Sequence, residues 1–88
     1  NAVDDNNYNY KASVYPNPAN DFINIKISDS PVIFNKMSIC NSMGQQVKTQ
    51  SITNNEFGVD ISNLQNGLFF IELSNGIQST TLRFTTAR

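Results

Sequence analysis

Apolar and polar side chains alternate residue by residue over several short runs of this 88-residue chain. Ile23, Ile25 and Ile27 are the clearest case, and the same period of two recurs in residues 37–40 and 57–61. Side chains of a β-strand point alternately to its two faces, so these runs predict half-buried strands. One further run contains many β-forming residues but is mostly polar: Gln45-Gln46-Val47-Lys48-Thr49-Gln50-Ser51-Ile52. Such a composition is typical of an exposed or edge strand.

Turn-forming residues separate the runs at regular intervals, and no window of usable length has a helical period. The turns are expected at Asp29-Ser30-Pro31, Asn41-Ser42-Met43-Gly44, Asn54-Asn55, Asn66-Gly67 and Asn75-Gly76. Residues 62–65 could form one helical turn, which is enough only for a connector. This organisation predicts an all-β domain, an antiparallel β-sandwich of about seven short strands.

Asn75-Gly76 is the strongest hairpin signal in the chain, because a two-residue type I′ turn needs positive φ at both central residues. With those two residues in the turn, Ser74 pairs with Ile77 and Phe69 pairs with Leu82. We assign the face that carries Phe69 to the core.

The other face of the same hairpin carries two large apolar side chains beside a guanidinium. In this register Leu68 lies across from Arg83, and Phe70 lies across from Thr81. Leu68, Phe70 and Arg83 therefore form a patch that another protein could bind, unless a loop or the N-terminal segment covers it. We refer to these three residues as the outer patch.

Pro16-Asn17-Pro18 is an unusual entry to a strand, since neither proline can donate a hydrogen bond to a sheet. Each proline also keeps the preceding residue, Tyr15 or Asn17, out of the helical region. We expect a stiff corner that leads from a linker into the first strand and blunts a sheet edge. The Asn17 side chain is expected to bond backbone groups left free by the bend.

Charge and hydropathy exclude several classes of partner. Six Lys and Arg residues nearly balance seven Asp and Glu residues, so no basic stripe is available for nucleic acid. The longest apolar run, residues 68–71, is far too short to span a bilayer. Residues 1–12 are polar and aperiodic, and we interpret them as a flexible linker from an upstream domain, with residues 13–88 forming the domain. The chain is expected to be a piece of a longer protein, with any export signal upstream.

The residues offer little for catalysis or metal binding. The chain has no His to act as an acid–base partner, and its carboxylates are scattered, so no catalytic site, metal site or cofactor is expected. Calcium at Asp4 and Asp5 is conceivable but lacks a spaced loop. Cys40, the only cysteine, is interpreted as a small, partly buried filler. Tyr8, Tyr10 and Tyr15 could stack on sugar rings, although two of the three lie in the linker.

Three blocks of the sequence, taken in order, resemble the type A C-terminal sorting domains of the type IX (Por) secretion system of Bacteroidetes. The first is Tyr15-Pro16-Asn17-Pro18-Ala19 followed by residues 21–25; the second is residues 39–47, with Gly44 after a polar turn. The third is residues 59–71, which contain Gly67, Leu68, Phe69 and Phe70, and Arg83-Phe84 follows near the end of the sequence. The resemblance covers about residues 14–85. Phe69 stands where the family mostly has Tyr, and residues 85–88 are more polar than is usual.

The resemblance implies an immunoglobulin-like sandwich that acts as a secretion address and has no enzymatic activity. It implies a recognition motif on the residues that match: Tyr15, Pro16, Asn17, Pro18, Gly44, Gly67, Leu68, Phe69, Phe70, Arg83 and Phe84. The implied partners are an outer-membrane translocon and a sortase-like transpeptidase that cuts in or near the linker, with an upstream cargo domain in the same chain. The implied location is the periplasm in transit, then the cell surface or the medium.

Two other classes of function stay open on the sequence. One is a carbohydrate-binding accessory module, which would bind polysaccharide as an isolated domain. The other is a fibronectin-like structural spacer, which a parent chain continuing well beyond Arg88 would favour.

Overall fold

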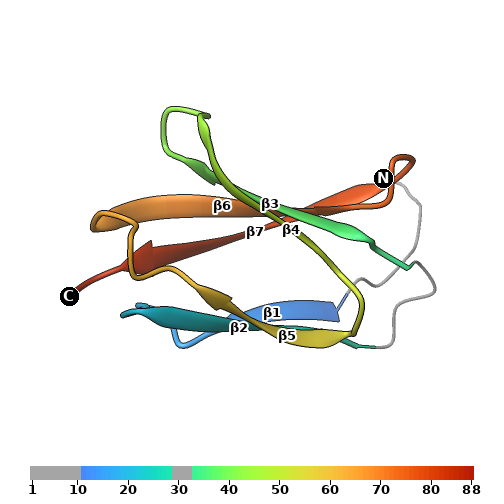
Figure 1. Cartoon of the computed structure of the whole chain (residues 1–88), viewed down its shortest axis with the longest axis horizontal. Helices are drawn as coiled ribbons and strands as arrows, with labels where there is room; N and C mark the ends of the chain where they lie inside the picture. Colours follow the sequence, from blue (N-terminus) through green and yellow to red (C-terminus); the bar gives the residue numbers. More distant parts are fainter. Residues whose placement is uncertain (1–10, 29–32) are drawn as a thin grey trace.

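Two antiparallel sheets pack face to face in the computed structural model, which describes residues 11–28 and 33–88 (Figure 1). The strands are β1 (Lys11–Tyr15), β2 (Phe22–Ser28), β3 (Lys36–Asn41), β4 (Gln46–Ser51), β5 (Glu56–Asp60), β6 (Gly67–Ser74) and β7 (Ser79–Thr86). One sheet has the order β1-β2-β5 and the other β4-β3-β6-β7. The expected all-β, immunoglobulin-like sandwich of seven strands is confirmed. The described residues include no helix long and apolar enough to cross a membrane.

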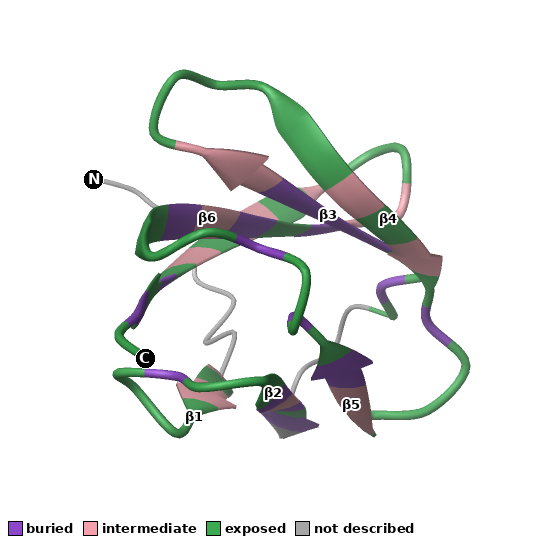
Figure 2. Ribbon diagram, turned by 60° about the vertical axis from the view of Figure 1, so that its left-hand side comes forward, coloured by how far each residue is buried: buried purple, intermediate pink, exposed green. Residues whose placement is uncertain are grey.

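The core lies between the two sheets, where the alternating apolar residues meet (Figure 2). Ile23, Ile25 and Ile71 are fully buried, as the period of two predicts. The rings of Phe69 and Phe84 stack within this core, with centroids 5.5 Å apart and planes 21° from parallel. Their packing joins β6 to β7 at the paired positions of the ladder. Assigning the Phe69 face to the core is therefore confirmed.

Strand β1 comes before Pro16-Asn17-Pro18, so our expectation that this corner leads from a linker into the first strand is wrong. Lys11–Tyr15 pairs with β2 from Lys11↔Ser28 to Tyr15↔Asn24. Ala12 and Val14 turn inward and pack against the core. With only two small apolar positions, the strand gave too weak a pattern to predict. The corner connects two strands of one sheet, and residues 1–10 lie outside the described residues.

The β6–β7 hairpin has a different register from the expected one, shifted by two residues. Ser74 pairs with Ser79, and Phe69 pairs with Phe84. The side-chain oxygen of Asn75 accepts hydrogen bonds from the amides of Ile77 (2.9 Å) and Gln78 (2.8 Å). Asn75 thus precedes the turn instead of occupying it, and Gly76, with φ of 90°, takes the position that needs a left-handed backbone. A shift of two residues keeps every side chain on its predicted face.

Candidate functional site

Three loops and the last residues of the chain come together at one end of the sandwich, which we call the motif end (Figure 1, left). The loops are residues 16–21 between β1 and β2, 42–45 between β3 and β4, and 61–66 between β5 and β6. Strand β7 ends beside them at Thr86. Each of the three blocks singled out in the sequence contributes one loop to this end, because the antiparallel strands bring every second connection to the same side.

The Pro16-Asn17-Pro18 corner is bonded to β7. Both X-Pro peptides, Tyr15-Pro16 and Asn17-Pro18, are cis. The Asn17 side-chain oxygen accepts a hydrogen bond from the Thr85 amide at 3.1 Å, and Ala19 donates its amide to the Thr85 carbonyl at 2.7 Å. These bonds occupy backbone groups on the outer edge of β7, so the corner does blunt a sheet edge. The groups that Asn17 bonds belong to β7 and not to the bend itself.

Arg88 ties two of the loops together. Its Nε lies 3.0 Å from an Asp21 carboxylate oxygen, the one ion pair among the described residues. Its terminal nitrogens donate to the carbonyls of Ile61 and Leu64, and Asn66 accepts a bond from the Arg88 amide at 3.2 Å. One guanidinium therefore joins the β1–β2 loop to the β5–β6 loop through charge-assisted hydrogen bonds.

The β5–β6 loop begins with a capped turn. Asp60 accepts a hydrogen bond from the Ser62 amide at 2.9 Å. That backbone bond, with a side-chain bond from Ser62 and the nearby Lys48 charge, lowers the pKa of Asp60. The loop then closes on β7, where the Thr86 hydroxyl donates to the Gln65 carbonyl at 2.8 Å and accepts from the Gly67 amide at 2.9 Å.

Replacing Asp60 with Asn should make stability less dependent on pH in the acid range. The pKa of Asp60 is lower in the folded than in the unfolded chain, so its carboxylate stabilises the fold above the unfolded value near 3.8. This contribution disappears as the pH falls through the folded value. Melting temperatures of parent and Asp60→Asn should therefore differ at pH 7 and converge as the pH falls below 3.8 and then through the lower folded value. A difference in melting temperature that stays constant as the pH falls below 3.8, or that Glu72→Gln reproduces, would refute this explanation.

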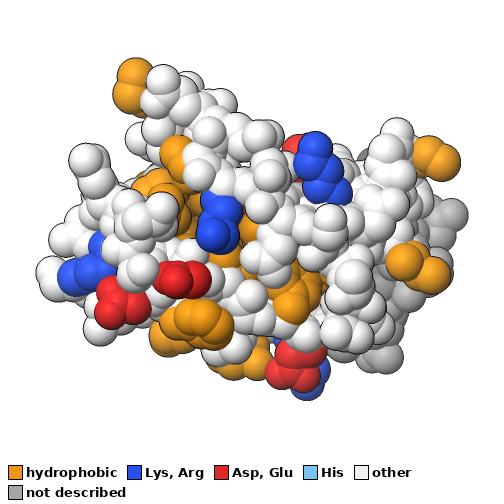
Figure 3. Space-filling model, in the orientation of Figure 1, with side chains coloured by type: hydrophobic (Ala, Val, Ile, Leu, Met, Phe, Trp, Pro, Cys, Tyr) orange, Lys and Arg blue, Asp and Glu red, His pale blue; other side chains and the backbone are white. Residues whose placement is uncertain are grey.

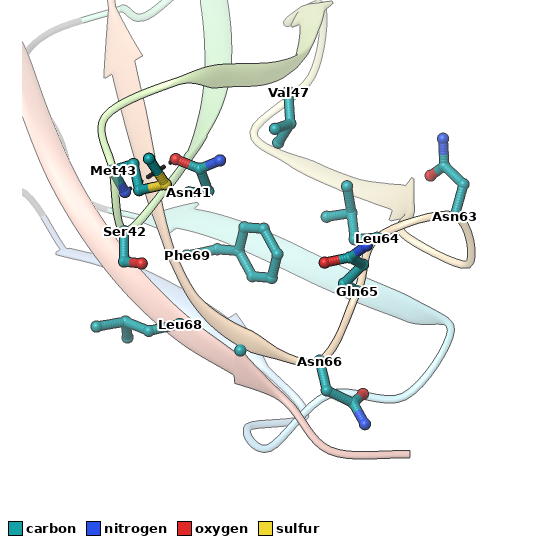
Figure 4. A pocket seen from close by; sticks show the side chains of 11 residues that line it. Asn41, Ser42, Met43, Val47, Asn63, Leu64, Gln65, Asn66, Leu68 and Phe69 are labelled. Atoms are coloured by element: carbon teal, nitrogen blue, oxygen red, sulfur yellow. Dashed lines mark hydrogen bonds between the residues drawn. The ribbon is translucent and has the colours of Figure 1, made fainter.

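A cleft of about 510 Å³ opens at the motif end, between the β3–β4 turn and the β5–β6 loop (Figure 4). It is lined by residues 41–43, 47 and 63–69, none of which is charged. Phe69 lies in the middle of the cleft in Figure 4, with Asn41 on one side and Leu64 on the other. The walls thus come from two of the sequence blocks, and the lining combines an apolar floor with carboxamide side chains.

The Asn41 side chain shapes the wall of this cleft that the β3–β4 turn forms. Its oxygen accepts from the amides of Met43 (2.9 Å) and Gln45 (3.0 Å), and its nitrogen donates to the Gln45 side chain. The turn also contains Gly44, whose amide bonds the Asn41 carbonyl at 3.0 Å. Met43 stands at the tip of this turn with 80% of its surface exposed.

The outer patch lies on the outer face of the four-stranded sheet, beside the cleft. Phe70 pairs directly with Arg83, and Leu68 pairs with Thr85, where we expected Thr81 and Arg83 as their partners. Leu68 and Arg83 are exposed and Phe70 is half-buried. Leu68 also lines the cleft, so cleft and patch form one continuous surface. On the face of the molecule shown in Figure 3, Lys and Arg side chains are interspersed with Asp and Glu, with no large region of one sign.

The other candidate residues are dispersed. Phe69 and Phe84 are in the core, and Tyr15 lies on the outer face of the three-stranded sheet. Within the described part of the chain no three His, Cys, Asp or Glu residues group as metal ligands. Cys40 is a half-buried free thiol opposite Phe70. Tyr8, Tyr10, Asp4 and Asp5 lie outside the described residues.

Residues 13–86 match a family model described as the secretion system C-terminal sorting domain. The chain belongs to this family. Sorting domains of this family are secretion signals of the type IX system and not catalytic domains, and they direct export across the outer membrane to the cell surface or the medium. The recognised resemblance is therefore confirmed, and with it the association with Bacteroidetes. No curated protein matches the chain.

Sequence reasoning did not identify the residues that hold the motif end of this sorting domain together. Arg88, Asp21 and Thr86 make contacts that connect segments 19 to 67 residues apart along the chain. The polar character of residues 85–88 was visible, but nothing in the sequence said what those side chains would bond. The departure from the apolar ending usual in the family is what could have drawn attention to Arg88.

Proposed function

We propose that the folded motif end of this domain is the address that the outer-membrane type IX translocon recognises, and that the upstream cargo is exported with it. The observation that carries the proposal is the meeting of residues 39–47 and 59–71, two of the family-like blocks, as the walls of one uncharged cleft. The domain would reach the translocon from the periplasm in its folded form.

The surface beside the cleft supports recognition by a protein. Aromatic and Arg side chains contribute most to binding energy in protein interfaces, and the outer patch offers Phe70 next to Arg83. Leu68 connects this patch to the cleft, so a partner could contact both at once. Pro16, Asn17 and Pro18 act in this proposal by fixing the end of β7, and Gly44 and Gly67 by shaping the two walls.

A sortase-like transpeptidase would then separate cargo from signal within residues 1–12. Lys11 and Ala12 already pair with Ser28 and Ile27, so we place the cut on the N-terminal side of Lys11. Proteases need an unpaired backbone, and a cut there leaves every strand of the sandwich intact. Mass spectrometry of the released domain should find its first residue at or before Lys11. A fragment starting inside β2 would contradict this assignment.

A reporter protein fused to the N-terminus of residues 1–88 should reach the surface or the medium of a bacterium that has the type IX system. The reporter with an established sorting domain is the positive control. A folded fusion that stays in the periplasm while that control is exported would refute the proposal. A structural spacer, the alternative left open by the sequence, predicts the same periplasmic retention.

Phe70→Ser should reduce export of this fusion while costing only about 1 kcal/mol of stability, much less than a core variant. Phe70 is half-buried on the outer face, so its loss removes an anchor for the partner without opening a cavity in the core. Ile77→Ser is the matched control, because Ile77 is 91% exposed in the turn at the other end of the sandwich. A loss of stability in Phe70→Ser as large as that of a core variant would show that the side chain acts in folding.

A further inference from the structure

The outer face of the three-stranded sheet carries two exposed aromatic side chains that do not line the cleft at the motif end. Tyr15 is 41% exposed and Phe22 is 51% exposed. Tyr15 pairs with Asn24, which pairs with Gly58, and Phe22 lies on the same face two residues before Asn24. Among the described residues no element packs on this face, which points away from the other sheet (Figure 1). We call the face formed by Tyr15, Phe22 and Asn24 the aromatic face.

Both aromatic side chains lie along the sheet instead of standing away from it. The Tyr15 hydroxyl donates to the Glu56 carboxylate at 3.0 Å, so the side chain reaches from β1 across β2 to β5. The Phe22 ring covers the backbone of Gly58, where an added Cβ would lie 2.5 Å from ring atom Cε2. The absence of a side chain at position 58 is therefore what lets the ring lie against β5.

Polar groups complete the aromatic face. The Asn24 carboxamide lies beside Gly58 and makes no hydrogen bond to another described residue, so it can bind a ligand. Lys26 and Glu56 are paired across β2 and β5 and balance each other's charge. Asp60, at the end of the face, is bonded to the Ser62 amide. The face therefore presents no cluster of cations that would attract a polyanion.

We propose that the aromatic face binds a neutral polysaccharide. The faces of pyranose rings carry C–H groups that pack on aromatic rings, and their hydroxyl groups bond carboxamides and carboxylates. Three strands about 4.8 Å apart and five residues at about 3.3 Å rise give a face of only roughly 250 Å². A stable protein interface buries about 800 Å² on each partner, so the size favours a narrow glycan chain over a protein.

The flatness of the aromatic face narrows the class of glycan. Side chains that lie down on a sheet form a planar support, which fits an extended, ribbon-like chain and not a coiled one. β-1,4-linked and mixed-linkage glucans are neutral and extended, and they carry hydroxyl groups along both edges. Binding to them is independent of the export function proposed above and uses the opposite sheet from the outer patch.

Affinity electrophoresis of the 88-residue chain in native gels tests the proposal, with hydroxyethyl cellulose and barley β-glucan as probes. Both glucans should retard the parent chain. Phe22→Ala and Tyr15→Ala should weaken the retardation about tenfold, as expected for loss of a main anchor. Gly58→Ala should weaken it as well, because its Cβ displaces the Phe22 ring. Leu68→Ala, on the other sheet, is the control and should bind like the parent.

Melting temperatures of all variants distinguish a loss of binding from a loss of folding. If Tyr15→Ala is unstable, Phe22→Ala alone decides whether the aromatic face binds the glucans. The proposal is overturned if neither glucan retards the folded parent, or if Phe22→Ala and Gly58→Ala bind as well as the parent. Stronger retardation by dextran sulfate than by either neutral glucan would also overturn it, since binding would then follow charge. So would a Phe22→Ala variant that loses export but keeps glucan binding, because the face would then bind a protein.

Discussion

Phe84→Ala is expected to lower the free energy of unfolding by about 3–5 kcal/mol, the usual cost of removing a buried phenylalanine. Phe84 is 1% exposed and stacks on Phe69 at 5.5 Å, so the substitution leaves a cavity between β6 and β7. A chain of this length has a total stability of roughly 4–13 kcal/mol at about 0.05–0.15 kcal/mol per residue. The variant should therefore lose a large part of its stability, with a fall in the urea midpoint that is readily measured.

The matched control for Phe84→Ala is Phe70→Ala on the neighbouring strand. Phe70 is the same residue type but faces outward and is half-buried, so its truncation should cost about 1 kcal/mol. Equal losses in the two variants would mean that the faces of the β6–β7 hairpin are wrongly assigned.

Arg88→Ala is expected to destabilise the motif end by about 1.5–3 kcal/mol, the range for hydrogen bonds to a charged group. The substitution leaves Asp21 without its ion-pair partner and removes the guanidinium hydrogen bonds to the Ile61 and Leu64 carbonyls. The side chain is only 25% exposed, so water replaces these bonds incompletely. Beyond a lower urea midpoint, amide hydrogen exchange in residues 61–67 should become faster, because this loop loses its connection to the β1–β2 loop.

Arg83→Ala is the control for Arg88→Ala. Arg83→Ala also removes a guanidinium, but from an exposed position on the outer face. The free energy of unfolding should therefore change by less than about 0.5 kcal/mol. Exchange that accelerates throughout the sandwich in Arg88→Ala would show a global role for Arg88. Exchange that stays unchanged in residues 61–67 would show that the guanidinium does not hold this loop.

The strands and their buried faces could be predicted because burial on one side of a strand leaves a period of two in the sequence. Ile23, Ile25 and Ile27 show this period and are all buried. Strand β1 could not be found in the same way, because its inward side chains are only Ala12 and Val14. The hairpin register depends on the Asn75 side chain, which accepts hydrogen bonds from two amides of the turn. The turn is therefore centred one residue later than expected, which shifts the strand pairing by two residues. Propensity alone does not distinguish these two placements of Asn-Gly.

The candidate site was predictable only in part. The sequence blocks identified which segments matter, and the antiparallel topology explains why their loops meet at one end. The contacts that hold this end are tertiary: Asn17 bonds Thr85, and Arg88 bonds Asp21, in each case across nearly the whole chain. The aromatic face was missed because Phe22 joins Tyr15 only after β1 and β2 pair. The platform considered from the sequence combined Tyr15 with Tyr8 and Tyr10, which lie outside the described residues.

The central claim, that a folded surface at the motif end is the export signal, is tested most directly by a triple variant of the cleft. Met43, Asn63 and Gln65 line the cleft and are exposed, and their side chains bond no other described residue, so alanine at all three should preserve the fold. Ile33→Ala with Ile77→Ala, at the opposite end, is the control. We predict that the reporter fused to the triple variant is exported at least about tenfold less than the parent, with an unchanged melting temperature. Export equal to the parent by the triple variant, with loss of export in the control, would contradict the claim.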